Sequence, residues 1–188
     1  MKFDHFLTSY VNKLSEAILH SKFSNINRAL SEIEKIIKKR GTIFVCGNGG
    51  SAAIANHYVC DYLKFLRQKT KYKPRVISLS NNIETITAIA NDLNKNKIFS
   101  YQAESLCDKN DLVIIISSSG NSENIIELLK FTKKKKIKTI GFSGFKGGKL
   151  KNKADISVHI NTDNYGTAED SHHVLMHAIL QYLIMKLK

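Results

Sequence analysis

The sequence predicts an α/β fold, a doubly wound, five-stranded parallel sheet in flavodoxin-like strand order, preceded by two extra helices. Three observations support this prediction. Short β-branched runs alternate with amphipathic helical patterns, the loops between them are short, and the 188-residue chain contains a single proline. The run at 111–116 is almost continuously apolar, which is typical of a strand covered on both faces.

Two amphipathic helices are expected first, at 3–20 and 25–39, and each keeps one apolar stripe. These stripes need a partner, either the flank of the sheet or another subunit. Strands are then expected at 42–46, 75–79, 111–116, 138–142 and 156–160. Helices are expected at 52–66, at 83–92, at 96–107, after Ser122 to about Lys134, and at 168–187.

The composition has one unusual feature, a formal net charge of +13 from 29 Lys and Arg against 16 Asp and Glu. Such an excess first indicates nucleic acid or an anionic membrane as a partner. However, 25 of the 29 are Lys, whereas readers of bases and phosphates favour the planar fork of Arg. A solvated lysine surface is therefore the favoured interpretation, with 133–136 as the exposed end of a helix, and a nucleic-acid surface is the alternative.

The apolar runs and the cysteines indicate a cytoplasmic protein. The longest apolar runs are far too short to cross a bilayer, and the N-terminus lacks the apolar core of a secretion signal. Cys46, Cys60 and Cys107 are odd in number and irregular in spacing, which fits neither a disulfide framework nor a metal site. We therefore expect reduced thiols, with Cys60 as a small buried helix residue.

Two strand ends carry loops that suit an anionic ligand. Gly47-Asn-Gly-Gly-Ser51 follows the first strand, Ser117-Ser-Ser-Gly-Asn-Ser122 follows the third, and each leads into a helix. Free N–H groups at a helix N-terminus, rotatable hydroxyls and an approachable glycine backbone all favour a phosphate. Either loop alone fits a simple helix cap, but two at neighbouring strand ends favour a phosphorylated small molecule. Neither loop matches a nucleotide-binding fingerprint, so no nucleotide is expected.

These motifs resemble those of the sugar-isomerase (SIS) family, and within it the phosphoheptose isomerases, over essentially the whole chain. The matching segments are Cys46–Ser51 with His57, Ala88–Asp92, Ile116–Ser122, Gly141–Lys149 and an acidic-His pattern in the last helix. The resemblance implies a single SIS domain over 1–188, with 1–40 as leading helices that join the central bundle of a cytoplasmic homotetramer. It also implies isomerisation of sedoheptulose 7-phosphate to a heptose 7-phosphate through an enediol, supplying heptose for lipopolysaccharide or capsule.

The resemblance also assigns candidate site residues. Asp61 and His177 would be the catalytic pair. The residues expected to bind the substrate are Asn48, Gly49, Gly50, Ser51, Asn91, Asp92, Ser117, Ser118, Ser119, Ser122 and Glu169. Four matching positions hold zinc in some relatives, and here they carry His57, Asp61, Glu169 and His177, all competent ligands. The isomerisation chemistry does not strictly require the metal.

Helical spacing brings parts of this set together independently of the resemblance. His57 and Asp61 are four residues apart, and Glu169, His173 and His177 form a stripe at the same spacing. An aldose–ketose isomerase needs a base beside the carbon and an acid beside the carbonyl oxygen, roles that a carboxylate and an imidazole can fill. His57 alone also fits an ordinary helix histidine, and His173, for which the resemblance gives no catalytic counterpart, fits an interface or buried histidine.

Two residues depart from the family, which usually has Glu where this chain has Asp61 and Gln where it has Glu169. The shorter Asp61 sets a carboxylate back by about 1.5 Å, and a misplacement of about 1 Å can cost around a hundredfold in rate. The added carboxylate of Glu169 would compensate, or the two changes mark a different sugar phosphate. Two facing carboxylates would also raise one pKa, which suits a general acid.

Two other functions stay open from the sequence. A non-catalytic SIS protein would bind a sugar phosphate or a protein partner, such as a replication-initiation factor. Relatives of that kind tend to lose the acid–base pair, which this chain keeps in Asp61 and His177. An isomerase of a pentose or hexose phosphate is the third possibility, because the leading helices and the single SIS unit favour a heptose phosphate only through the resemblance.

Overall fold

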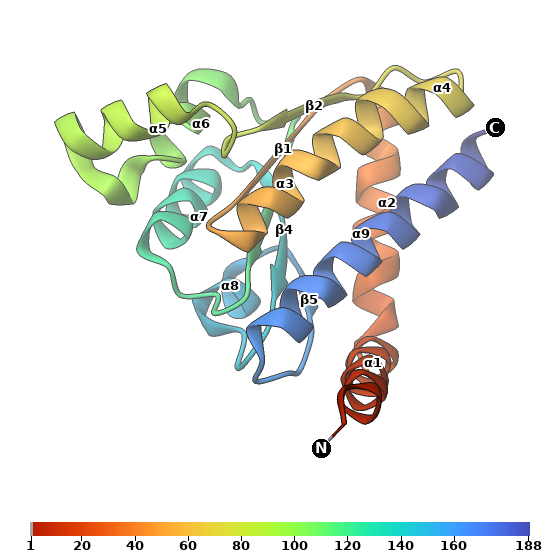
Figure 1. Ribbon diagram of the computed structural model, residues 1–188. Coiled ribbons are helices and arrows are strands. Elements are labelled where there is room, and N and C mark those ends of the chain that lie inside the picture. Colours follow the sequence, from red (N-terminus) through yellow and green to blue (C-terminus); the bar gives the residue numbers. More distant parts are fainter. Residues whose placement is uncertain (1) are drawn as a thin grey trace.

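A five-stranded, all-parallel sheet in the order β2-β1-β3-β4-β5 forms the centre of the protein (Figure 1). This computed structural model describes residues 2–188. The strands are β1 (Thr42–Gly47), β2 (Arg75–Ser78), β3 (Leu112–Ser117), β4 (Lys138–Ser143) and β5 (Ile156–His159). The predicted doubly wound sheet with flavodoxin-like order is confirmed. Every residue of β1 and β3 is buried, as expected of central strands covered on both faces.

Helices cover both faces of the sheet. The helices are α1 (Phe3–Leu19), α2 (Phe23–Lys39), α3 (Gly50–Cys60), α4 (Arg67–Lys69), α5 (Ile83–Ile89), α6 (Ser100–Leu106), α7 (Glu123–Lys135), α8 (Gly148–Lys153) and α9 (Tyr165–Leu187). Side chains of α2, α3 and α9 share one core cluster with Ile114, and side chains of α6, α7 and α8 share the other with Ile115. Adjacent residues of β3 therefore point into the cores on opposite faces of the sheet.

The predicted elements are present, with three local differences. The final helix begins at Tyr165 rather than at 168, because the Asn164 side chain accepts the Thr167 N–H and caps it. Helix α8 was not predicted, since its short sequence buries only Leu150 and shows no helical period. The stretch from Ile83 to Leu106 is divided more finely than expected, into α5, η2 (Ala90–Asn94), η3 (Lys95–Lys97) and α6.

Two segments are π-helical, a rare conformation that often marks functional sites. The first, η1 (Asp61–Leu66), continues α3 and begins at Asp61. The second, η2, contains Asn91 and Asp92. Both segments therefore hold residues that the sequence places at the substrate.

The surface largely follows the expectations. Lys133–Lys136 are exposed at the C-terminal end of α7, as predicted. Cys46, Cys60 and Cys107 are free thiols, but Cys60 is exposed, so the prediction that it is buried was wrong. The buried face of α3 is formed by residues such as Ile54 and Tyr58 instead. Within residues 2–188, none of the helices has the length and apolar character needed to cross a membrane.

His172 on α9 makes the stability of the fold sensitive to acid. Its side chain is fully buried against Phe142, and burial lowers its pKa to about 4. An unfolded histidine titrates near 6.5, so between pH 6.5 and 4 the unfolded state binds more protons. Stability therefore falls as the pH is lowered through this range, by up to roughly 3 kcal/mol at 1.4 kcal/mol per pKa unit. Urea unfolding at pH 7 and pH 4.5 measures this loss.

His172→Leu is expected to remove this part of the acid sensitivity. Neither ring nitrogen of His172 has a partner at hydrogen-bond geometry among the described residues, and the nearby Ser143 carbonyl already accepts the Ile160 N–H at 2.8 Å, so an apolar replacement leaves no new polar group unpaired. An equally steep loss of stability in the variant would show that other groups cause the acid sensitivity.

Candidate active site

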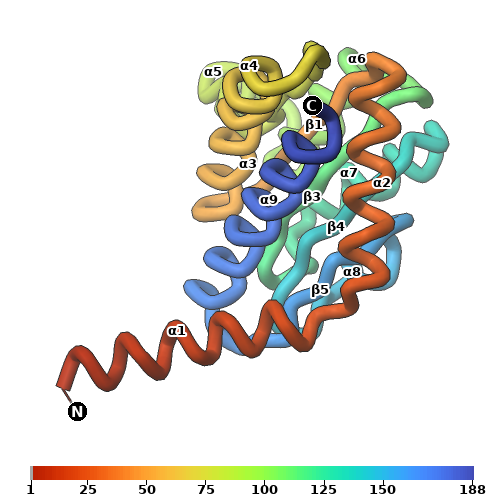
Figure 2. The backbone as a smooth tube through the Cα atoms, turned by 90° about the vertical axis from the view of Figure 1, so that its right-hand side faces the viewer, coloured from red at the N-terminus to blue at the C-terminus, as the bar shows by residue number. Residues whose placement is uncertain are grey.

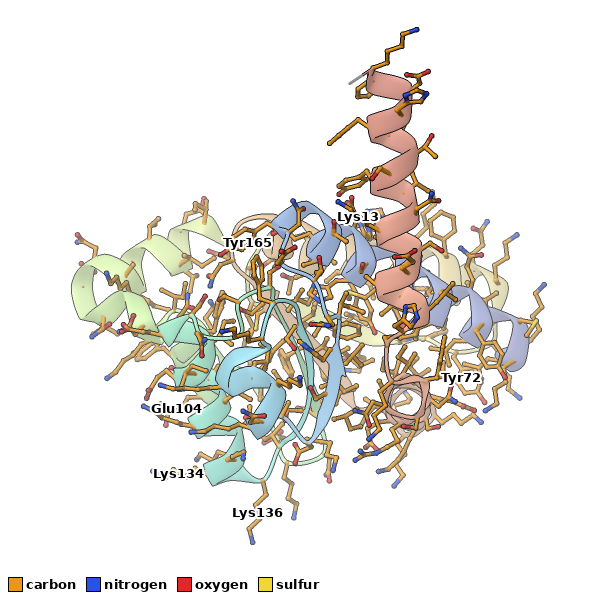
Figure 3. All side chains as sticks on the ribbon, turned by 90° about the horizontal axis from the view of Figure 1, so that it is seen from below. Lys13, Tyr72, Glu104, Lys134, Lys136 and Tyr165 are labelled. Atoms are coloured by element: carbon orange, nitrogen blue, oxygen red, sulfur yellow. The ribbon has the colours of Figure 1, made fainter. Side chains whose placement is uncertain are left out.

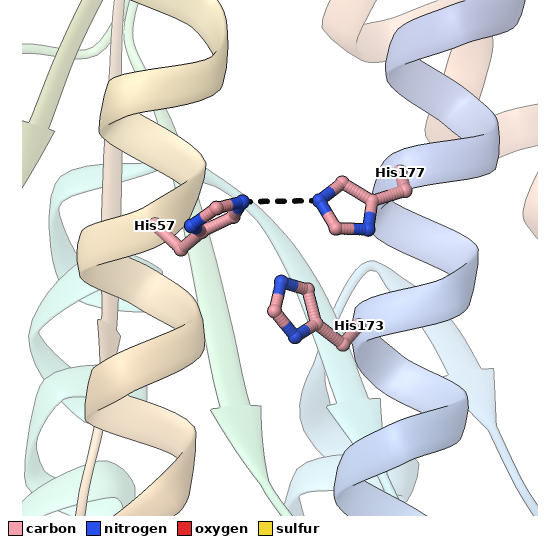
Figure 4. A group of neighbouring side chains, drawn as sticks. All are labelled: His57, His173 and His177. Atoms are coloured by element: carbon pink, nitrogen blue, oxygen red, sulfur yellow. Dashed lines mark hydrogen bonds between the residues drawn. The ribbon is translucent and has the colours of Figure 1, made fainter.

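Three candidate residues converge where α3 and η1 face α9. His57 Nε2 lies 3.1 Å from His177 Nε2, and Asp61 Oδ1 and Oδ2 lie 3.4 Å from His57 Nε2 and 3.2 Å from His177 Nε2, respectively. Figure 4 shows the two imidazoles meeting across the helices. The Asp61 side chain is only 7% exposed, against 45% for His57 and 40% for His177. A buried carboxylate thus lies behind two accessible imidazoles.

The neighbouring side of the α3–η1 helix helps to fix the direction of His57 and Asp61. Tyr58 and Tyr62 are buried and their rings stack at 4.2 Å, which anchors that side of the helix in the core. His57 and Asp61 share one face, as their spacing of four residues predicts, and the structure turns this face toward α9. A groove of about 560 Å³ beside the group runs between η1 and the C-terminal half of α9, and it gives access to these side chains.

His173 and Glu169 lie along the same stripe of α9 but have different surroundings. The His173 ring stacks on that of His177 at 4.5 Å and meets that of His57 edge-on at 4.9 Å. Ligand nitrogens of these three histidines lie within 4.8 Å of one another, a group that fits a metal ion (Figure 4). The Glu169 carboxylate lies instead against Gly50 at the start of α3, where any side chain at position 50 would collide with it.

Two groups on this stripe have shifted pKa values. Burial, reinforced by the charge of Asp170, raises the pKa of the Glu169 carboxyl. Burial, together with the neighbouring imidazoles of His177 and His57, lowers the pKa of His173. The stripe therefore combines a carboxyl that holds its proton more readily with an imidazole that stays neutral more readily.

The serine loop between β3 and α7 is folded tightly at the carboxyl edge of the sheet. Ser117 and Ser118 are buried, whereas Ser119 and Ser122 are partly accessible. Gly120 turns the chain with a φ of +65°, and a Cβ there would collide with the carbonyl oxygen of Gly147 in the next loop. Ser122 makes no side-chain cap bond to α7, so its hydroxyl is available beside the helix N-terminus. This arrangement offers amides and hydroxyls to an anion.

The glycine loop after β1 is joined directly to the serine loop. Strands β1 and β3 are neighbours, as expected, and the Asn48 and Asn124 side chains exchange hydrogen bonds of 3.0 and 2.9 Å. The Ser80 hydroxyl donates to the carbonyl of Gly47 at 2.9 Å and accepts its N–H at 3.1 Å. Sequence reasoning missed Asn124 and Ser80, although the place of Asn124 in the first turn after the serine loop was a usable signal.

The remaining candidates are Gly49, Gly50 and Ser51 in the glycine loop and the start of α3, and Asn91 and Asp92 on η2, for which the described residues show no side-chain hydrogen bond to either loop. Gly49 and Gly50 are exposed, and Ser51 is buried in the first turn of α3. Asn91 and Asp92 are exposed on η2, where the Asn91 side chain donates to Asp92 Oδ1 at 2.7 Å. The π-helical segment that carries them packs on α5 and η3.

Comparison with known proteins identifies the family. A sequence profile of the SIS domain matches residues 6–144. A phosphoheptose isomerase of Campylobacter concisus is 32% identical over 158 residues, which cover 84% of this chain and 82% of that protein. The chain belongs to the phosphoheptose isomerase family of SIS-domain proteins. The family resemblance seen in the sequence is thus confirmed, and membership makes the chain an isomerase.

Solved structures agree with this family membership. The phosphoheptose isomerase of Neisseria gonorrhoeae superimposes with a TM-score of 0.85 at 26% identity, covering 96% of this chain and 96% of that one. The phosphoheptose isomerase of Francisella tularensis gives a TM-score of 0.86 at 26% identity, covering 98% of this chain and 96% of that one. The similarity extends over the leading helices as well as the sheet.

Proposed function

We propose that the protein interconverts sedoheptulose 7-phosphate and a heptose 7-phosphate, with Asp61 and His177 as its catalytic residues. The observation that carries this proposal is the contact of the Asp61 carboxylate with the His177 imidazole at 3.2 Å, in a chain of the phosphoheptose isomerase family. A carboxylate and an imidazole held together can serve as the base and the acid of an enediol mechanism.

The two loops would hold the substrate at its two ends. In the serine loop, the hydroxyls of Ser117, Ser118, Ser119 and Ser122 and the free amides of α7 would bind the phosphate. The glycine loop and Glu169 would face the sugar hydroxyls, because the Glu169 carboxylate lies at Gly50. The two hydrogen bonds between the side-chain amides of Asn48 and Asn124 would fix the distance between the glycine loop and the serine loop.

The proton transfers need only these two side chains. Asp61 would remove a proton from C1 of the open-chain ketose while His177 protonates the C2 carbonyl oxygen, which gives the enediol. The hydroxyl on C1 would then return a proton to His177 while C2 takes the proton from Asp61. C1 becomes the aldehyde, and both side chains end in their starting protonation states.

We also propose that the group of His57, Asp61 and His177 binds zinc. At Zn–N and Zn–O distances of 2.0–2.2 Å, two ligand atoms of a tetrahedral ion lie about 3.3–3.6 Å apart. The Nε2 atoms of His57 and His177 are 3.1 Å apart, and each contacts one oxygen of Asp61, Oδ1 at 3.4 Å from His57 and Oδ2 at 3.2 Å from His177, so these groups are close to the spacing that zinc requires. When bound, zinc would supply Lewis-acid polarisation of the sugar oxygens. Zinc held through His177 Nε2 would occupy the nitrogen that contacts Asp61, so the proton transfers above are those of the metal-free group, and turnover is to be measured with added zinc and with chelator.

We further propose a cytoplasmic homotetramer assembled through the leading helices. Helix α1 projects from the rest of the chain (Figures 2 and 3), and none of its residues is buried. It exposes Phe3, Phe6, Leu7 and Val11 on this projection. An apolar stripe of this kind favours a protein partner. The free thiols of Cys46, Cys60 and Cys107 support a reducing compartment.

The double substitution of Leu7 and Val11 by Lys is expected to dissociate this assembly, since it places charge in the apolar stripe. Light scattering coupled to size-exclusion chromatography should give the tetramer mass for the unaltered chain and a smaller mass for the variant. Lys13→Ala, an exposed change on the same helix, is the control and should leave the mass unchanged. A monomer from the unaltered chain would contradict the proposed assembly.

The proposed activity is tested by incubating the pure protein with sedoheptulose 7-phosphate and following the anomeric proton of the aldose product by NMR. The same assay with ribulose 5-phosphate and fructose 6-phosphate tests the pentose and hexose alternatives. Preferred turnover of the heptulose is the expected result. Turnover of none of the three, with or without zinc, would favour a non-catalytic sugar-phosphate protein.

A further inference from the structure

His173 contacts both histidines of the candidate site, and neither the family resemblance nor the proton transfers give it a role. We propose that His173 is a zinc ligand in this chain, in the place that the resemblance gives to Glu169. The three histidines would then supply three ligands, and Asp61, which contacts His57 and His177, would supply the fourth. This inference rests on the proposal that the site binds zinc, and it specifies which residues are the zinc ligands.

The positions along α9 favour His173. Four residues separate His173 from His177, so the two side chains leave the helix about 6 Å apart along its axis, on the same face. The stacked rings at 4.5 Å and the edge-on contact with His57 at 4.9 Å follow from this register. Nitrogens of the three rings already lie within 4.8 Å of one another, so small side-chain rotations bring them to tetrahedral separations.

The position of Glu169 favours a different role for that residue. It precedes His177 by eight residues, or about 12 Å along the helix axis, and its carboxylate lies at Gly50. Gly50 in turn precedes His57 by seven residues, which is nearly two turns of α3. Glu169 therefore lies about two helical turns from the point where His57 and His177 meet. This leaves its carboxylate free to face the sugar.

Exchanging a carboxylate for an imidazole changes the chemistry of the site. With two carboxylates, the formal charge of a bound Zn²⁺ would be cancelled, whereas Asp61 alone leaves a net charge of +1. Three imidazoles also favour zinc, cobalt, nickel and copper over magnesium, calcium and manganese, which prefer oxygen ligands. The expected site is thus more selective for nitrogen-preferring metals, and it holds a positive charge beside the sugar oxygens.

Metal binding to the apoprotein, measured without substrate, tests this inference. Zinc affinity is obtained by competition with a chromophoric chelator, and the visible spectrum of added Co²⁺ reports the ligand set. His173→Asn is expected to weaken zinc binding by more than about 100-fold, the upper end of the loss that a second-shell change produces. It should also alter the Co²⁺ spectrum. Glu169→Gln should change zinc affinity by less than about threefold and leave that spectrum unchanged.

Matched controls separate this result from general effects. His20→Asn makes the same chemical change at an exposed histidine at the end of α1 and should leave zinc affinity unchanged. His173→Gln serves as a second variant should His173→Asn fail to fold. Unaltered zinc affinity in a folded His173 variant would overturn the inference, and a large loss in Glu169→Gln would give the ligand role to Glu169. Isomerase activity is measured separately, so zinc binding through His173 in an inactive protein would count against the proposed reaction alone.

Discussion

His177→Gln is expected to lower kcat/KM for sedoheptulose 7-phosphate by roughly 10²–10⁴-fold, the usual contribution of a general acid or base. Asp61→Asn should cause a loss of similar size, because the two side chains act on the same proton transfers and lie 3.2 Å apart. Steady-state kinetics with a coupled assay measures both losses. Circular dichroism and thermal unfolding establish that each variant is folded.

The double variant distinguishes a shared step from separate structural effects. If Asp61 and His177 act as a unit, combining the substitutions should cost little more than either alone. Gln181→Ala, an exposed change in the groove beside the site, is the control and should keep nearly full activity. A His177 variant with activity near that of the unaltered chain would exclude this residue as the acid.

Gly120→Ala is expected to weaken binding of the phosphate group. The residue has a φ of +65°, and a Cβ would collide with the carbonyl oxygen of Gly147. The serine loop must therefore move away from the neighbouring loop, which displaces the amides and hydroxyls that face the phosphate. We expect KM for the sugar phosphate to rise by at least about tenfold, which corresponds to 1.4 kcal/mol. Kinetics and competition by inorganic phosphate check this increase.

Gly49→Ala is the matched control for Gly120→Ala. Gly49 also has a positive φ, +54°, with a ψ of −126°, but a Cβ there meets nothing within 4 Å. Both variants should therefore lose about 1–3 kcal/mol of stability through backbone strain, whereas only Gly120→Ala should lose affinity for inorganic phosphate. Equal loss of phosphate affinity in the two variants would show that strain alone, and not the collision, disrupts the loop.

Much of the fold was predictable because each central element carries a strong local pattern. The apolar run of β3 and the loops after β1 and β3 were enough to predict a parallel sheet with two adjacent phosphate-binding ends, and the pairing of Gly47 with Ile116 places those ends side by side. Helix α8 was missed because one buried leucine in six residues carries no period. The π-helical segments have no sequence signature at all, since they are set by packing.

The site could be predicted within each helix but not between helices. Spacing alone placed His57 beside Asp61, and Glu169, His173 and His177 on one stripe. Which member of that stripe meets His57 depends on how far α9 is shifted along α3, and this shift is fixed by the packing of the two helices. The structure places His177 and His173 at His57, and Glu169 at Gly50.

The reaction in D₂O tests the proposed proton transfer most directly. Sedoheptulose 7-phosphate is incubated with the protein in D₂O, and the sugar phosphates are followed by proton NMR and mass spectrometry. We expect the aldose heptose 7-phosphate to appear with deuterium at C2, because the proton held by Asp61 exchanges with solvent before it is returned. The Asp61→Asn variant should form product and exchange deuterium at a rate lowered by the same roughly 10²–10⁴-fold. A substrate that stays unconverted and free of deuterium at C1 with the unaltered protein would contradict the proposed isomerase.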